Sequence, residues 1–230
     1  MRVSHSQNSL LKALPREDYK CLLPHLKTIA LNLDEVIYES EEVVKQIYFP
    51  LRGVISLVKA TENGATVEVG VVGREGMVGT PVLLGGRKSL YKAVVQTSGE
   101  ALVIDAKTLV KEFDNCGKLQ ALLHSYLLGW LVQVTQSVVC TRFHTAEKRF
   151  CRWLLMMHDR VGKDEFALTQ KTIARMLGIR RPGVSEIASK LMRKGLIRYS
   201  RGRMAILDRK LLEETACECY QVYQLKVSLN

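Results

Sequence analysis

The sequence predicts an α+β fold made of an N-terminal antiparallel β-barrel or jelly roll, a long helix and a C-terminal winged helix-turn-helix. Three observations support this prediction. Short β-branched runs separated by turn residues fill the range 30–105. Apolar residues at helical spacing follow over about five turns. A basic segment with glycine and proline at turn positions comes last. The expected domains are therefore 1–115, 116–143 and 144–230.

The composition excludes several classes of protein. Of the 230 residues, 47% are hydrophobic and 25% are charged, which is ordinary for folded domains and excludes a largely disordered chain. No apolar stretch approaches the roughly 20 residues that a membrane span needs. The N-terminus lacks the apolar core of an export signal. We therefore expect a cytoplasmic protein with no membrane partner, in which the six cysteines are reduced.

The pattern of histidines and cysteines predicts neither a metal site nor a catalytic site. The five histidines are scattered and no Cys-x-x-Cys pair occurs, so the spacing of a zinc site is missing. The range 30–105 contains no histidine, which argues against a metal-dependent enzyme built on the barrel. Cys217 and Cys219 are expected on the last helix, where residues two apart point in different directions, so we interpret them as ordinary thiols.

The N-terminal region begins with short helical pieces over 9–29, broken at Pro15 and Pro24. A pair of strands joined at Asn63-Gly64 is indicated by a strong hairpin signal. The expected strands cover 36–38, 46–49, 54–58, 66–69 and 101–104.

The long helix is apolar on more than one face, so it must be covered on more than one side. We expect one side to pack on the barrel and the other to pack on a second copy as a two-stranded coiled coil. The alternative is a helix wholly buried in one domain, but the barrel is too small to cover it. The predicted dimerisation residues follow one apolar stripe: Leu119, Leu123, Tyr126, Leu127, Trp130, Val134 and Val138.

The net charge of +11 is unevenly distributed. Residues 1–143 contain 16 Lys and Arg against 14 Asp and Glu, whereas residues 144–230 contain 18 against 9. Within 171–203 there are ten basic residues and one acidic residue, Glu186. A basic block on one part of a chain is typical of a protein that binds a polyanion, whereas a solvated helix surface has balanced signs.

Residues 168–191 have the pattern of a helix-turn-helix, and each punctuating residue has a mechanical reason. Thr169 can cap the first helix. Gly178 suits the left-handed backbone of the tight turn, and Pro182 suits the first turn of the second helix. The segment 195–208 then reads as strand, basic glycine turn and strand, which is a wing. The predicted DNA-binding residues are Thr169, Gln170, Arg180, Arg181, Ser185, Glu186, Ser189, Lys190, Arg201 and Arg203.

Taken over its full length, the chain resembles the CRP/FNR family of bacterial transcription regulators. The run 47–57 is similar to the second and third barrel strands of that family. The resemblance implies a homodimer that binds a two-fold double-stranded DNA operator and contacts RNA polymerase. It also implies an effector bound between a glycine turn and the long helix. The corresponding residues here are Gly76, Met77, Val78, Gly79, Arg87, Lys88, Ser89, Leu90, Tyr126 and Trp130.

The effector region departs from the pattern of family members that bind cyclic nucleotides. Met77 stands where those members have the glutamate that holds the ribose. Ser89-Leu90 stands where they have the Arg-Ser pair that holds the phosphate, and a cyclic phosphate would be left poorly paired. These departures from the family pattern therefore predict a small-molecule effector other than cAMP. Only Cys21 lies near the N-terminus, which argues against an iron–sulfur cluster, and axial haem ligation by His25 or His124 is not expected.

The recognition helix departs from the family pattern as well. Family members often have Arg-Glu-x-x-x-Arg here, but this chain has Pro182 at the acidic position and Glu186 at the second arginine. Arg181 can still pair with guanine. We therefore expect an unfamiliar operator. The alternative function is a ligand-binding allosteric module without a role on DNA, which leaves the wing and the basic segment unexplained.

Overall fold

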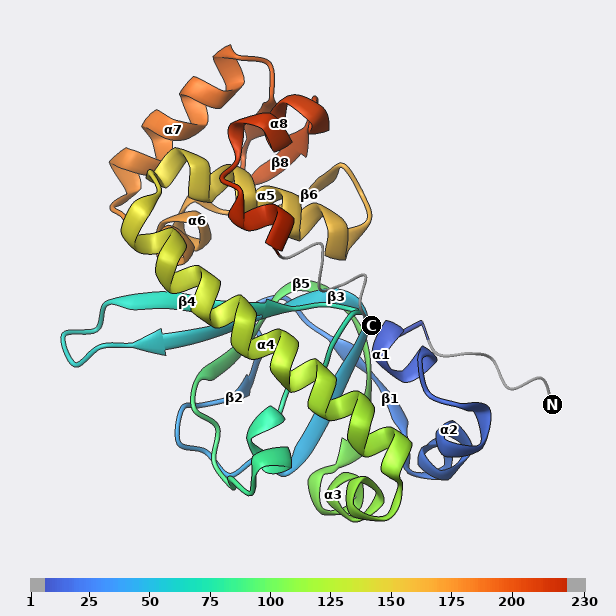
Figure 1. Ribbon diagram of the computed structural model, residues 1–230. Coiled ribbons are helices and arrows are strands. Elements are labelled where there is room, and N and C mark those ends of the chain that lie inside the picture. The colour runs from blue at the N-terminus through green and yellow to red at the C-terminus, as the bar shows by residue number, and fades with distance from the viewer. Residues whose placement is uncertain (1–6, 223–230) are drawn as a thin grey trace.

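The computed structural model describes residues 7–222 of the chain. Figure 1 shows an N-terminal sheet domain, the long helix α4 crossing it, and a smaller C-terminal domain packed against one end of the sheet. Helices α1 (Ser9–Lys12) and α2 (Arg16–Leu22) and the short 3₁₀ turn η1 (Leu23–His25) precede the sheet. A second 3₁₀ turn, η2 (Thr80–Leu84), lies in the connection between the last two strands of this sheet.

The N-terminal sheet is antiparallel and open. Its strands are β1 (Lys27–Leu31), β2 (Val36–Tyr38), β3 (Gln46–Ala60), β4 (Thr66–Val72) and β5 (Lys92–Asp105). The order is β1-β5-β3-β4, with β2 also paired to β5, so the strands do not close into a barrel. The jelly-roll prediction is confirmed and the closed-barrel alternative is wrong.

Two long strands dominate this sheet and correct the strand predictions. The expected strands 46–49 and 54–58 are parts of the single strand β3, and 101–104 is the second half of β5. Register shifts near Arg52 let both strands bend around the core. A side chain on Gly99 would meet the backbone oxygen of Arg52 at 2.0 Å, so only glycine permits this close approach. The prediction of helical structure over 9–29 is wrong at its end, because residues 27–29 belong to β1. The first half of β5 was not predicted, because polar residues interrupt its alternation.

Helices α3 (Ala106–Asn115) and α4 (Gly117–Phe143) follow β5, and α5 (Ala146–Val161) begins the C-terminal domain. That domain contains β6 (Glu165–Ala167), α6 (Gln170–Leu177), α7 (Arg181–Arg193), β7 (Ile197–Ser200), β8 (Arg203–Ile206) and α8 (Arg209–Thr215). Strands β6, β8 and β7 form a small antiparallel sheet. No helix within residues 7–222 is long and apolar enough to cross a membrane.

The two domains share buried surface. The first core lies inside the jelly roll and includes the inner face of α4. The second core belongs to the C-terminal domain, yet it includes Val54 of β3 and Val71 of β4. Arg160 of α5 is buried at this junction, donates to the carbonyl oxygen of Val71 and pairs with Glu75 at 2.8 Å. The C-terminal domain is therefore docked on the sheet of its own chain.

Candidate nucleic-acid interface and effector turn

Helices α6 and α7 form the predicted helix-turn-helix. The Thr169 side chain accepts a hydrogen bond from the backbone N–H of Thr172 at 3.1 Å and caps α6. Gly178 ends α6 with φ of 64°, a left-handed conformation that favours glycine. Pro182 lies in the first turn of α7. The structure thus confirms the local role that the sequence assigned to each of these three residues.

Strands β7 and β8 form the wing. They pair from Ile197 with Ile206 to Ser200 with Arg203, and Arg201-Gly202 forms the tip. The backbone N–H of Leu168 donates to the Gly202 carbonyl at 2.8 Å, which holds the tip beside the start of α6. Strand β6, which completes the small sheet, was not predicted because only three residues form it.

One groove joins the start of α6, the exposed face of α7 and the wing. Six predicted DNA-binding residues line it: Thr169, Gln170, Arg181, Ser185, Ser189 and Arg201. The Gln170 side-chain amide donates to the Ser185 hydroxyl at 3.1 Å, which links the two helices. Lys171, Tyr199 and Ser200 also line the groove and were missed. Their only signal was proximity to predicted residues, since Lys171 follows Gln170 and the other two precede the wing tip.

The structure places four predicted DNA-binding residues outside the lining of this groove: Arg180, Glu186, Lys190 and Arg203. Lys190 pairs with Glu147 of α5, and this hydrogen bond holds the pKa of the Glu147 carboxyl below its usual range. Arg203 pairs with Glu165 at 2.6 Å. Both basic side chains therefore hold ion pairs within the domain, although both stay exposed enough to meet phosphate.

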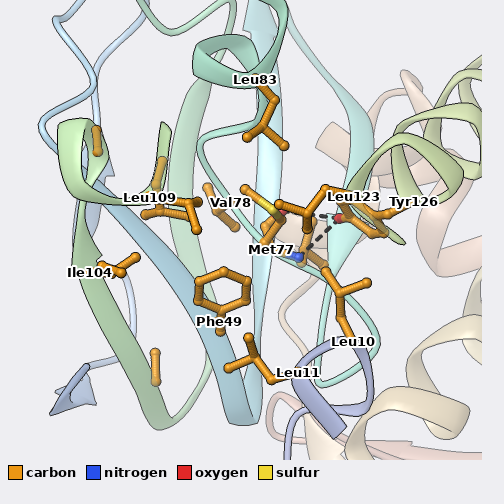
Figure 2. Close-up of a cluster of buried hydrophobic side chains, with 14 of the residues drawn as sticks. Leu10, Leu11, Phe49, Met77, Val78, Leu83, Ile104, Leu109, Leu123 and Tyr126 are labelled. Atoms are coloured by element: carbon orange, nitrogen blue, oxygen red, sulfur yellow. Dashed lines mark hydrogen bonds between the residues drawn. The ribbon is translucent and has the colours of Figure 1, made fainter. Parts of the chain in front are cut away.

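The predicted effector turn is filled by the chain's own side chains. Gly76, Met77, Val78 and Gly79 are all buried, and Met77 is 1% exposed. Figure 2 shows Met77 pointing into the core between Phe49 and Leu123. The Tyr126 hydroxyl accepts from the Met77 N–H at 3.1 Å and donates to the Met77 carbonyl at 3.0 Å. Burial raises the pKa of this phenol, so Tyr126 keeps the proton that it donates.

The neighbouring polar groups are already engaged. Glu75, the carboxylate nearest the turn in sequence, accepts from the Gly73 N–H at 3.1 Å and from Arg160. The Ser89 side chain is buried and donates to the Tyr91 carbonyl at 2.6 Å. Trp130 packs so closely on β4 that a side chain on Gly70 would meet its ring at 2.0 Å. The other predicted effector residues, Arg87, Lys88 and Leu90, are exposed.

The structure shifts the predicted dimerisation surface of α4. Three of the predicted residues, Leu119, Leu123 and Tyr126, are buried in the chain's own core and cannot meet a partner. Leu127, Trp130 and Val134 are half-buried, and Val138 is 67% exposed. A stripe with coiled-coil spacing remains exposed, formed by the apolar residues Leu128, Leu131 and Val138 together with Thr135. The helix is apolar nearly all round, so the sequence did not show which face the sheet would cover.

The interpretation of Cys217 and Cys219 as residues of one helix is wrong. Helix α8 ends at Thr215, and Cys217 lies in the irregular segment that follows. Sequence reasoning also missed that both cysteines come together with Cys140 and His144. Because the pair Cys140 and His144 is more than 70 positions from the pair Cys217 and Cys219, no local spacing could have indicated that the two pairs meet.

Comparisons with known proteins match both domains. The description of a cyclic nucleotide-binding domain matches residues 29–116, and that of a Crp-like helix-turn-helix domain matches residues 148–215. None of the curated proteins matches the chain in sequence.

Solved structures share the fold at low sequence identity. FixK2 from Bradyrhizobium japonicum is 19% identical, with 84% of this chain and 98% of that chain covered and a TM-score of 0.73. TTHB099, a transcriptional regulator of the CRP family from Thermus thermophilus, is 20% identical, with coverage of 82% and 96% and a TM-score of 0.70. The c-di-GMP responsive global regulator CLP from Xanthomonas campestris is 15% identical, with coverage of 84% and 100% and a TM-score of 0.68.

Proposed function

Because the chain belongs to the CRP/FNR family of bacterial transcription regulators, we propose that it is a homodimeric, sequence-specific DNA-binding protein of the cytoplasm and not an enzyme. The observation that supports this most directly is the groove between α6, α7 and the wing. It gathers Arg181, Lys171 and Arg201 beside hydroxyl and amide side chains. Basic groups can contact phosphate there, while Arg181 can pair with a base edge. Contact with RNA polymerase stays a prediction.

Two protomers would pair through the exposed stripe of α4. Leu128 and Leu131 are 62% and 61% exposed, which is costly for large apolar side chains unless a partner covers them. The stripe has the three- and four-residue spacing at which two helices interdigitate. Such pairing would place two recognition helices about one turn of DNA apart, as a two-fold operator requires.

The effector of this regulator, as we propose it, is not cAMP. The turn lacks a free carboxylate for a ribose, because Glu75 is held by Arg160. Met77 and Tyr126 fill the space beside it. An effector would therefore have to displace apolar side chains, which favours a small molecule with substantial apolar surface.

Selection of duplexes from a random pool tests the proposal, with the purified protein at near-physiological salt. We expect an enriched two-fold motif with half-sites about one helical turn apart. Arg181→Ala should weaken binding of the selected duplex by about 1–3 kcal/mol, on the order of 5- to 150-fold, and relax preference at one base pair.

Arg16→Ala is the matched control, because it removes the same charge from an exposed position in α2, far from the groove. It should leave affinity within experimental error. If Arg181→Ala binds every duplex as tightly as the parent does, Arg181 does not read DNA. If the parent binds no duplex at all, the chain is better explained as a ligand-binding allosteric module.

A further inference from the structure

Three thiols and an imidazole converge where α4 meets the C-terminal domain. Their ligand atoms all lie within 4.8 Å of one another, and we call this group the Cys₃His cluster: Cys140, His144, Cys217 and Cys219. Cys140 lies in the last turn of α4, and His144 is the residue that caps this helix. The other two members come from the segment after α8. The cluster therefore joins the long helix to the far end of the described chain.

Two of the distances between donor atoms are close to those around a tetrahedral metal ion, and all four atoms lie within 4.8 Å of one another. The Cys140 and Cys217 sulfurs are 3.5 Å apart, and the Cys219 sulfur is 3.5 Å from Nδ1 of His144. With Zn–S bonds of about 2.3 Å and a Zn–N bond of about 2.0 Å, tetrahedral geometry places two sulfurs about 3.7 Å apart and sulfur and nitrogen about 3.5 Å apart. Only small movements would bring all four ligands onto one ion.

The surroundings of the cluster are those of a metal site. Glu218 meets the other ring nitrogen of His144, Nε2, at 3.0 Å, which fixes the ring with Nδ1 directed at the Cys219 sulfur. A carboxylate on the outer nitrogen is the usual partner of a metal-binding histidine. The Gln136 side-chain amide donates to the Cys219 sulfur at 3.0 Å. Both contacts orient a ligand atom toward the same centre.

Simple packing explains this arrangement less well. Buried cysteines often act as small apolar residues. Here, however, the three thiols lie at most 3% exposed in a cluster of their own, separate from both large cores. A histidine nitrogen and an amide N–H both meet the Cys219 sulfur, which apolar packing does not require.

We propose that the Cys₃His cluster binds one structural Zn²⁺ ion that fastens the segment after α8 to the junction of α4 and α5. Four protein ligands leave no open position, which is typical of structural zinc and not of catalytic zinc. Three thiolates and one imidazole in a tetrahedron favour Zn²⁺ over harder ions. Arg152 of α5 interacts electrostatically with Cys140 and Cys217, and its charge offsets the single negative charge of the occupied site.

The ion would help to fix the orientation of the C-terminal domain relative to α4. The junction between α4 and α5 sets the direction in which the C-terminal domain leaves the long helix. Metal bonds that tie Cys140 and His144 to residues after α8 close a loop around the whole C-terminal domain. The folded chain holds the four ligands together and the unfolded chain does not, so zinc binds the folded chain more tightly. Zinc should therefore raise the melting temperature of the full chain.

Metal content of the purified full-length protein tests the proposal. The protein is prepared with a reductant, stripped with a chelator, reloaded with Zn²⁺ and passed over a desalting column before elemental analysis. We expect one zinc per chain, a higher melting temperature than the stripped protein, and protection of three thiols from alkylation. Replacement by Co²⁺ should give the sulfur charge-transfer band and intense visible bands of a tetrahedral thiolate site.

Variants locate the ion. Cys140→Ser and Cys219→Ser should lose the zinc, whereas Cys21→Ser, at an exposed thiol of α2, should retain it. If the serine variants fold poorly, Glu218→Gln provides a second test. The Glu218 side chain is 70% exposed, so its replacement does not disturb the packing of a core. We expect that change to weaken zinc about 10- to 100-fold in competition with a chelator.

Two results would overturn the proposal. One is zinc retained equally by the parent and by folded Cys140→Ser and Cys219→Ser variants. The other is a parent protein that binds neither Zn²⁺ nor Co²⁺ after full reduction. This result overturns the proposal whether or not material prepared without reductant contains a Cys140–Cys217 disulfide. In the disulfide case the same cluster would be a redox pair instead of a metal site.

Discussion

At the scale of single residues, Glu68 of β4 is a carboxyl group whose surroundings disfavour its ionised form. It accepts hydrogen bonds from the Ser56 hydroxyl at 2.5 Å and from the Trp153 indole at 2.7 Å, and Trp153 belongs to the C-terminal domain. Burial raises its pKa above the ordinary value of 4.5, and the two hydrogen bonds only partly oppose this. The Glu68 carboxyl is therefore harder to ionise in the folded chain than in the unfolded chain.

This setting predicts that stability falls as pH rises. Below pH 4.5 both folded and unfolded chains hold the Glu68 proton, so the group adds no penalty. Above that pH the unfolded chain releases the proton while the folded chain retains it, and the free energy of unfolding decreases until the folded pKa is passed. Each pH unit of this window contributes about 1.4 kcal/mol. Glu68→Gln should remove this decline, as measured by urea unfolding across a pH series.

Glu62→Gln is the matched control, since Glu62 is an exposed carboxylate in the turn of the same hairpin. The pH profile of that variant should parallel the parent. A Glu68→Gln profile that also parallels the parent would mean that the folded chain ionises Glu68 as readily as the unfolded chain does.

At the scale of elements, local chemistry made some parts predictable and tertiary packing decided the rest. Thr169, Gly178 and Pro182 act on backbone within a few residues of their own positions, so their roles could be inferred from sequence. The inner face of α4 could not, because the surface that covers Leu119 and Leu123 comes from distant segments. The Cys₃His cluster was missed for the same reason.

The exposed stripe of α4 leads to a prediction about assembly. Leu131→Glu should weaken the dimer, because each protomer loses the burial of a leucine and the two new carboxylates face each other. Losing about 1.5–3 kcal/mol for each of the two leucines predicts a dimer dissociation constant that is at least 100-fold higher. Analytical ultracentrifugation over a concentration series measures this constant.

Thr28→Glu adds the same charge at an exposed position of β1, away from α4, and should leave the dimer intact. Equal effects of both substitutions, or a parent that sediments as a monomer, would exclude this stripe as the interface.

At the scale of the whole molecule, the docked C-terminal domain contacts the segment beside the proposed effector turn, Gly76–Gly79, through Arg160 of α5. Glu75 lies just before Gly76 of the turn, and Arg160 lies near the end of α5 in the C-terminal domain. Their ion pair, together with the Arg160 bond to the Val71 carbonyl, crosses the junction. Any effector that moved the turn would therefore act on α5 directly, without a long pathway.

Arg160→Met should uncouple the two domains. The Arg160 side chain is 1% exposed, so its removal leaves the Glu75 carboxylate partly buried without that cation, at a cost of about 3–5 kcal/mol. We expect the parent to unfold in one calorimetric transition and Arg160→Met to unfold in two, with the C-terminal domain melting first. Adding Glu75→Gln should recover part of the loss, because the second change removes the orphaned charge. Arg52→Met, which breaks an exposed pair with Glu100 inside the sheet domain, should leave one transition. A single unchanged transition in Arg160→Met would show that apolar contacts alone hold the domains together.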